Sequence, residues 1–172
     1  MRKNVLQIAA VIFCLPLLAC STSKLARCPS VSVLVDTATA AVWQGNPPQF
    51  TYVARITDAK RDCDIEKFSK NVQGSVDITF QAYRPRAGAP AMYTVPFFVA
   101  ISTEGRILAK KVYSMQFNFD TQQTVSEVSQ SIDSLALTVG RDKQATDYGI
   151  LVGFQLSKAQ LDFNRRAGRY PR

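Results

Sequence analysis

Residues 76–83 read VDITFQAY, with apolar and polar side chains in strict alternation. Successive side chains of a β-strand point to opposite faces of its sheet. The apolar positions 76, 78, 80 and 82 therefore predict a strand with one buried face and one solvated face. A sheet of this kind needs a second layer to cover its apolar face.

Further strands are predicted on both sides of this one. Thr103–Arg106 predicts a hairpin turn between two of them. Pro96 has no backbone donor, which predicts an edge position or a bulge for its strand. Tyr113, Met115, Phe117 and Phe119 share one face, which is interpreted as core rather than as a ligand groove. The expected strands cover residues 31–35, 50–57, 93–102, 107–119, 135–139 and 148–156.

Residues 120–133 allow two interpretations. The spacing of the valines and a possible capping box at Thr124 and Glu127 fit a helix. The richness in Ser, Thr and Val favours irregular or strand structure instead. A short helix is predicted near the end of the chain, where Ser157 and Gln160 form a capping box and Gly168 is a stop signal.

About seven strands followed by one helix predict a mainly β fold, a single antiparallel β-sandwich over residues 28–172. The late strand that contains Tyr148 resembles a late strand of immunoglobulin-like domains. That resemblance implies an immunoglobulin-like form of the sandwich, although Trp43 and the cysteines do not follow the pattern of that family.

The first twenty residues have a different character. Arg2 and Lys3 precede an apolar run over residues 5–18, as in a secretory signal peptide. The run ends in Leu17-Leu18-Ala19-Cys20, which resembles the lipobox of bacterial lipoproteins. This resemblance implies a signal peptide over residues 1–19 and a lipidated tether over residues 20–27. It also implies lipidation of Cys20, with the covalent acyl lipid as the only attached group.

The same resemblance implies a location. Ser21 after the modified cysteine is permissive for transfer to the outer membrane, with the protein facing the periplasm, and the inner membrane is the alternative. In this oxidising compartment the two remaining cysteines of the body, Cys28 and Cys63, predict one disulfide. It would close a loop of about 36 residues, which contributes about 4 kcal/mol in the chain-entropy model.

The chain is basic, with a formal net charge of +8. A moderately basic envelope protein can approach anionic lipid or cell-wall polymer, or its charge can serve solubility. No nucleic-acid-binding module is indicated. Near the C-terminus a cluster of arginines is a possible contact for phosphate or carboxylate groups, or simply a basic tail. Its members are Arg165, Arg166, Arg169 and Arg172.

No catalytic residue and no metal site are predicted. The chain contains no histidine, which excludes a Ser-His-Asp triad and most zinc sites. The carboxylates around Cys63 alternate with lysine and arginine and are interpreted as a solvated, self-neutralising loop rather than a calcium site. They are Asp58, Asp62, Asp64 and Glu66.

The whole chain is also similar to function-unassigned lipoproteins of Gram-negative bacteria, and alphaproteobacteria are the expected source. The shared features are the Cys28-Pro29 start, the second cysteine, the stretch 148–156 and Asn164-Arg165. The resemblance brings no activity. The first hypothesis is a non-enzymatic, lipid-anchored structural or accessory binding module of an envelope complex, with a membrane and an envelope protein as partners. The alternative is a binding protein for an apolar or anionic small ligand.

Overall fold

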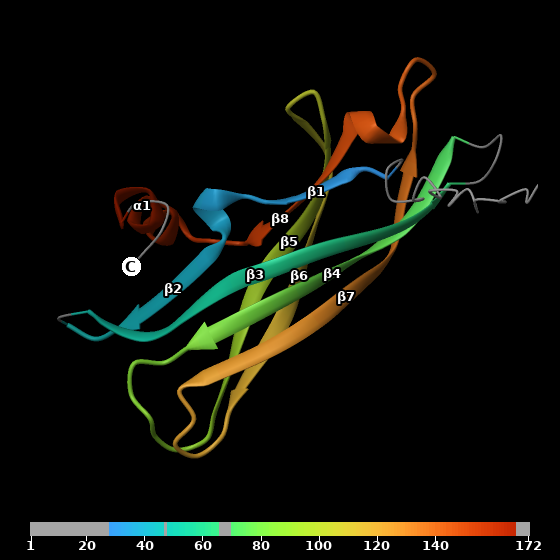
Figure 1. The fold of residues 1–172 in the computed structure, drawn as a ribbon. Coiled ribbons are helices and arrows are strands. Elements are labelled where there is room, and N and C mark those ends of the chain that lie inside the picture. The colour runs from blue at the N-terminus through green and yellow to red at the C-terminus, as the bar shows by residue number, and fades with distance from the viewer. Residues whose placement is uncertain (1–27, 47, 66–69, 168–172) are drawn as a thin grey trace, which may run out of the picture.

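The computed structural model describes residues 28–46, 48–65 and 70–167, and these form a β-sandwich of two four-stranded sheets. The first sheet has the order β1 (Ser30–Val33), β8 (Tyr148–Phe154), β5 (Ala91–Thr103) and β6 (Arg106–Phe119). The second sheet has the order β2 (Thr39–Gln44), β3 (Gln49–Ile65), β4 (Asn71–Tyr83) and β7 (Val125–Thr138). In Figure 1, β3, β4 and β7 lie in front of β5 and β6.

Three helical segments complete the described chain. Short 3-10 helices cover Val35–Thr37 and Ala145–Asp147, and the α-helix α1 covers Lys158–Ala167. The mainly β sandwich with a short terminal helix is confirmed. Two details of the prediction are wrong: β2 is an additional strand, and β1 pairs with β8 in parallel. In immunoglobulin domains the last two strands are neighbours in one sheet, whereas β7 and β8 lie in different sheets, so the strand order is not immunoglobulin-like.

The stretch 76–83 forms the inner face of β4, as its alternation predicts. Val76, Ile78, Phe80 and Ala82 are fully buried. The ring centroid of Phe80 lies 5.0 Å from that of Phe97 on β5, in the opposite sheet. Packing between the sheets therefore places these side chains at the centre of the core. The predicted apolar face of β6 is also core, since Met115, Phe117 and Phe119 are buried.

Residues 125–138 are a strand, so the second interpretation of residues 120–133 holds from Val125 onward. β7 pairs with β4 along almost its whole length, from Val125 opposite Tyr83 to Thr138 opposite Asn71. Pairing with β4 continues on both sides of a register shift at Asp133 and Ser134, and this pairing outweighs the weak helical spacing of the valines.

The edge position predicted for the strand of Pro96 is wrong. β5 lies between β8 and β6. The Pro96 carbonyl accepts a hydrogen bond from Gln155 N at 2.9 Å, one residue beyond the end of β8. The proline nitrogen faces the same side and cannot return a hydrogen bond to Gln155, and β8 ends at Phe154, directly before this residue. The predicted turn between β5 and β6 is confirmed: Glu104 and Gly105 both have positive φ, as a type I′ hairpin requires.

The acidic segment around Cys63 is not a loop. Asp58, Asp62 and Asp64 lie on β3, which runs on to Ile65, while Glu66 lies outside the described residues. Lys60 Nζ lies 3.0 Å from Asp58 Oδ2, and both side chains are largely exposed. The self-neutralising character holds for this pair, but the backbone that carries it is extended and hydrogen-bonded to β4.

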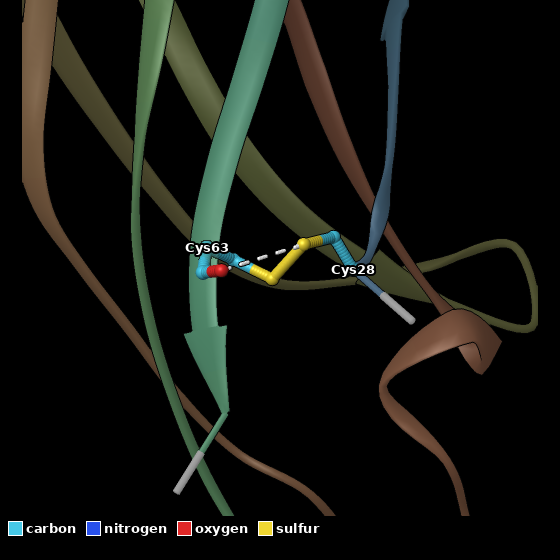
Figure 2. Close-up of a disulfide and its surroundings, with 2 residues drawn as sticks. All are labelled: Cys28 and Cys63. Carbon is cyan, nitrogen blue, oxygen red and sulfur yellow. Dashed lines mark hydrogen bonds between the residues drawn. A yellow bond between two sulfur atoms is a disulfide. The ribbon is translucent and has the colours of Figure 1, made fainter. Parts of the chain in front are cut away.

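The predicted disulfide joins Cys28 to Cys63, with 5.9 Å between the two Cα atoms (Figure 2). It links the residue that precedes β1 to the end of β3, across the two sheets. Both cysteines pack with Val72, Val139 and Tyr148 in a second, smaller core cluster. This cluster closes one end of the sandwich, which is called the Cys28 end below.

Candidate binding groove

Helix α1 begins with the predicted capping box. Ser157 N donates to Gln160 Oε1 at 2.9 Å, and Gln160 N donates back to Ser157 Oγ at 3.3 Å. On the exposed side of the helix, the ion pair with Lys158 lowers the pKa of the Asp162 carboxyl below its usual value. The first turn is therefore stabilised locally, which positions the rest of α1.

The inner side of α1 is tied to β2 and to the 3-10 helix before it by side-chain hydrogen bonds. Gln160 Nε2 donates to the carbonyl of Ala41 at 2.9 Å. Asn164 Nδ2 donates to the carbonyls of Asp36 at 2.9 Å and Thr39 at 2.8 Å. β2 is an outer strand, so α1 covers one margin of the second sheet and leaves the strands beyond it open.

Three aromatic rings pack between α1 and the β2–β3 hairpin. The ring of Phe163 lies 5.4 Å from that of Trp43 and 5.7 Å from that of Phe50, centroid to centroid. Phe50 remains about half exposed. The cluster forms an apolar end wall beside the helix.

On the outer face of the second sheet, one apolar row crosses all four strands. Ala41 on β2 is opposite Val53 on β3, Val53 is opposite Tyr83 on β4, and Tyr83 is opposite Val125 on β7. Ala41 is buried, while Tyr83 and Val125 are 50% and 43% exposed. The apolar row therefore begins beneath α1 and ends on β4 and β7, where its side chains are exposed to solvent.

The next row on the same face is polar. It consists of Thr39, Arg55, Gln81 and Glu127, paired in that order across the four strands. Arg55 is exposed and lies two residues from Val53, directly beside the apolar row. An exposed guanidinium next to an apolar surface suits a carboxylate or a phosphate on an apolar molecule.

Together these parts enclose a groove of about 510 Å³ between α1 and the outer face of the second sheet. Volumes of 300–1,000 Å³ are usual for small-molecule sites, which are also mostly apolar with a few polar groups. The groove can hold an elongated apolar body along the row and a negative group at Arg55. Its lining consists of Val35, Asp36, Thr39, Ala41, Phe50, Val53, Arg55, Gln81, Tyr83, Val125, Phe163, Asn164 and Ala167.

The predicted arginine cluster is only partly described. Arg165 Nε lies 3.3 Å from Asp36 Oδ2, so this arginine is engaged at the margin of the groove. Arg166 is exposed, and Arg169 and Arg172 lie outside the described residues, as does Cys20. The groove's own arginine, Arg55, was not expected from the sequence. Tyr83 and Phe50 carried the signal that could have indicated it, because large apolar side chains on an outward strand face imply a cover or a ligand.

Within the described residues, no three His, Cys, Asp or Glu side chains are grouped so that they could hold a metal ion. No helix of the described chain has the length and apolar character to cross a membrane.

The chain matches no protein-family model, no curated protein and no solved structure.

Proposed function

We propose that this protein is a lipid-anchored, non-enzymatic binding module of the bacterial cell envelope. Its ligand is an elongated apolar molecule with a negatively charged group, bound in the groove beside α1. The proposal of this ligand rests on the apolar row of the second sheet, with Arg55 beside it. The envelope location and the acyl anchor rest on residues 1–20, with the outer membrane favoured over the inner membrane by Ser21.

Physical chemistry supports this choice of ligand. Burial of apolar surface contributes roughly 25 cal/mol per Å², so covering Tyr83 and Val125 adds directly to affinity. Arg55 adds charge complementarity at a site that water can still reach, where it selects the orientation of the ligand more than it raises affinity.

An envelope protein is the second candidate occupant. The groove is open on the side of β4 and β7, where Tyr83 is half exposed, so a partner's apolar segment could enter it as well. This occupant corresponds to an accessory module of an envelope complex.

Native mass spectrometry of the full chain, extracted from bacterial membranes in mild detergent, tests the proposal. We expect a mass of residues 20–172 plus acyl groups, with a small ligand retained. Val125→Gln should weaken retention of the ligand about tenfold, because it replaces an apolar side chain of the groove with a polar one. Val112→Gln is the matched control, since Val112 is also a half-exposed valine on an outer strand but lies outside the groove. Arg55→Gln should weaken retention of the negatively charged ligand.

Each failure has its own signature. A mature protein without acyl groups contradicts the anchor. A ligand retained equally by the Val125→Gln and Val112→Gln proteins contradicts the groove as its site. An acylated protein that retains no small molecule, but crosslinks to an envelope protein through residue 125, replaces the ligand by a protein partner; neither ligand nor crosslink contradicts binding at the groove altogether.

A further inference from the structure

The β5–β6 hairpin lies at the Cys28 end of the sandwich. Pairing in the first sheet aligns Ser30 on β1, Gly149 on β8, Ser102 on β5 and Ile107 on β6 in one row. Cys28 precedes Ser30, and Glu104 and Gly105 follow Ser102, on the same side of this row. Figure 1 shows the hairpin and the start of β1 at the same end of the molecule, away from the β4–β5 and β6–β7 connections.

The hairpin carries two exposed apolar side chains directly after its turn. Ile107 and Leu108 are each 53% exposed, and Leu108 is the extra residue of a β-bulge, because Ile107 is opposite Ser102 and Ala109 is opposite Ile101. Burial along β6 begins only at Tyr113, and all residues from Arg106 to Val112 are exposed. The hairpin therefore projects beyond the core with two exposed apolar groups directly after its turn.

Basic residues flank these two side chains along β6. Arg106 precedes them, and Lys110 and Lys111 follow them. Lys110 Nζ lies 4.2 Å from the ring centroid of Phe98, and Lys111 Nζ lies 5.1 Å from that of Tyr113. The carboxylate of the turn, Glu104, is engaged by Lys143 and Arg106. Exposed apolar side chains flanked by basic residues are complementary to a bilayer that contains anionic lipid.

The length of chain between the proposed anchor and the sandwich points to the same occupant. Residues 21–27 reach roughly 25 Å even when fully extended. The disulfide holds Cys28 to β3, so β1 cannot detach from the sandwich and lengthen this connection. The acyl chains would thus keep the Cys28 end close to the bilayer.

We infer that the β5–β6 hairpin, through Ile107, Leu108 and the adjacent cations, contacts the surface of the membrane that holds the acyl anchor. This inference rests on the anchor of the proposed function. The contact orients the sandwich with its Cys28 end toward the lipid.

Fluorescence quenching by brominated lipid tests the contact in the full acylated protein, reconstituted in vesicles where phosphatidylglycerol is about one lipid in three. Leu108→Trp places a fluorophore on the hairpin, and Met92→Trp places one on an exposed position at the opposite end of β5, outside the groove. The emission of Trp43 alone, measured in the unsubstituted protein, is subtracted. We expect bromine to reduce the emission of residue 108 and not that of residue 92.

Two further measurements make the result decisive. Replacing phosphatidylglycerol by phosphatidylcholine, or Lys110 and Lys111 by glutamine, should reduce the quenching at residue 108. The intact mass of the same sample reports the acyl groups. An acylated protein without quenching at residue 108 overturns the membrane contact and leaves the anchor standing, whereas an unacylated mature protein overturns both. A blue-shifted but unquenched tryptophan at residue 108 shows that protein covers the hairpin instead, which also overturns the inference.

Discussion

Arg84 is a buried cation that holds two loops together. Its guanidinium donates to four backbone carbonyls, those of Gln123, Ala89, Gly88 and Asp120, at 2.6–3.2 Å. It also lies 5.1 Å above the ring of Phe119. The β4–β5 and β6–β7 connections are thereby joined at the end of the sandwich opposite Cys28. A flat guanidinium with donors in several directions is needed for this arrangement.

Replacing Arg84 by lysine should lower the free energy of unfolding by about 3 kcal/mol, because an ammonium cannot reach four carbonyls and leaves the buried cation of residue 84 with fewer hydrogen bonds. Urea unfolding measures the loss. Arg86→Lys is the control, since Arg86 is exposed in the same loop and should change stability by less than about 0.5 kcal/mol. Equal unfolding midpoints for the two variants would show that the four hydrogen bonds contribute little.

The sequence contains no indication of this role of Arg84. The segment from Arg84 to Pro90 is rich in Pro, Gly and Arg, a composition typical of loops, but loop composition says nothing of burial. The partners of Arg84 are backbone carbonyls far along the chain, and any residue type can supply a carbonyl. Arg55 was missed for a related reason: its importance comes from strand register, which is set by pairing with β2 and β4.

At the scale of elements, α1 forms the wall of the groove and depends on few contacts. None of its side chains is fully buried. Its attachment is the pair of hydrogen bonds from Asn164, the one from Gln160, the ring of Phe163 and the ion pair of Arg165 with Asp36. An element held mainly by such contacts opens more easily than the core strands.

Asn164→Ala should therefore loosen α1 without unfolding the sandwich. We expect faster amide hydrogen exchange in α1 and a stability loss of about 1–2 kcal/mol from the two lost hydrogen bonds. Retention of the groove's ligand should fall in the same variant. Arg166→Ala serves as the comparison, because Arg166 is exposed on the same helix. Unchanged exchange in the Asn164→Ala protein would mean that the other contacts of α1 hold the helix without Asn164.

The elements that were predicted well are those with a strong local signal. β4 and β8 alternate, the turn at Glu104-Gly105 contains the glycine that positive φ favours, and Ser157 and Gln160 cap α1 as expected. Gly153 on β8 permits a close approach, since a Cβ there would lie 2.0 Å from Thr37 Oγ1. β2 and the far half of β3 were missed because their strand structure comes from pairing and from the disulfide at Cys63, neither of which produces alternation.

At the scale of the molecule, the groove and the Cys28 end are far apart. β4 runs from Asn71, next to the Cys28 end, to Tyr83 in the groove. At about 3.3 Å per residue its length is about 40 Å. If the proposed membrane contact at the Cys28 end is correct, the groove lies at the far end of the sandwich from the lipid, and we expect its ligand or partner to come from outside that membrane.

The disulfide should be the largest single contribution to global stability. Cys28→Ser with Cys63→Ser should lower the free energy of unfolding by about 4 kcal/mol, because the unfolded chain regains the freedom of a long loop. Urea unfolding with and without reductant measures it. Reductant should act on the unsubstituted protein and leave the double variant unchanged. Identical curves for both proteins without reductant would contradict a stabilising crosslink.

The same crosslink also determines where a mechanical load on the N-terminal segment would act. β1 is a four-residue outer strand hydrogen-bonded only to β8, so only a few hydrogen bonds would resist a pull along it. The sulfur bridge instead passes tension at Cys28 to β3, a seventeen-residue strand paired on both sides. A force on the sandwich would then be resisted by many backbone hydrogen bonds loaded in shear. A force on the N-terminal segment would therefore leave β1 paired with β8.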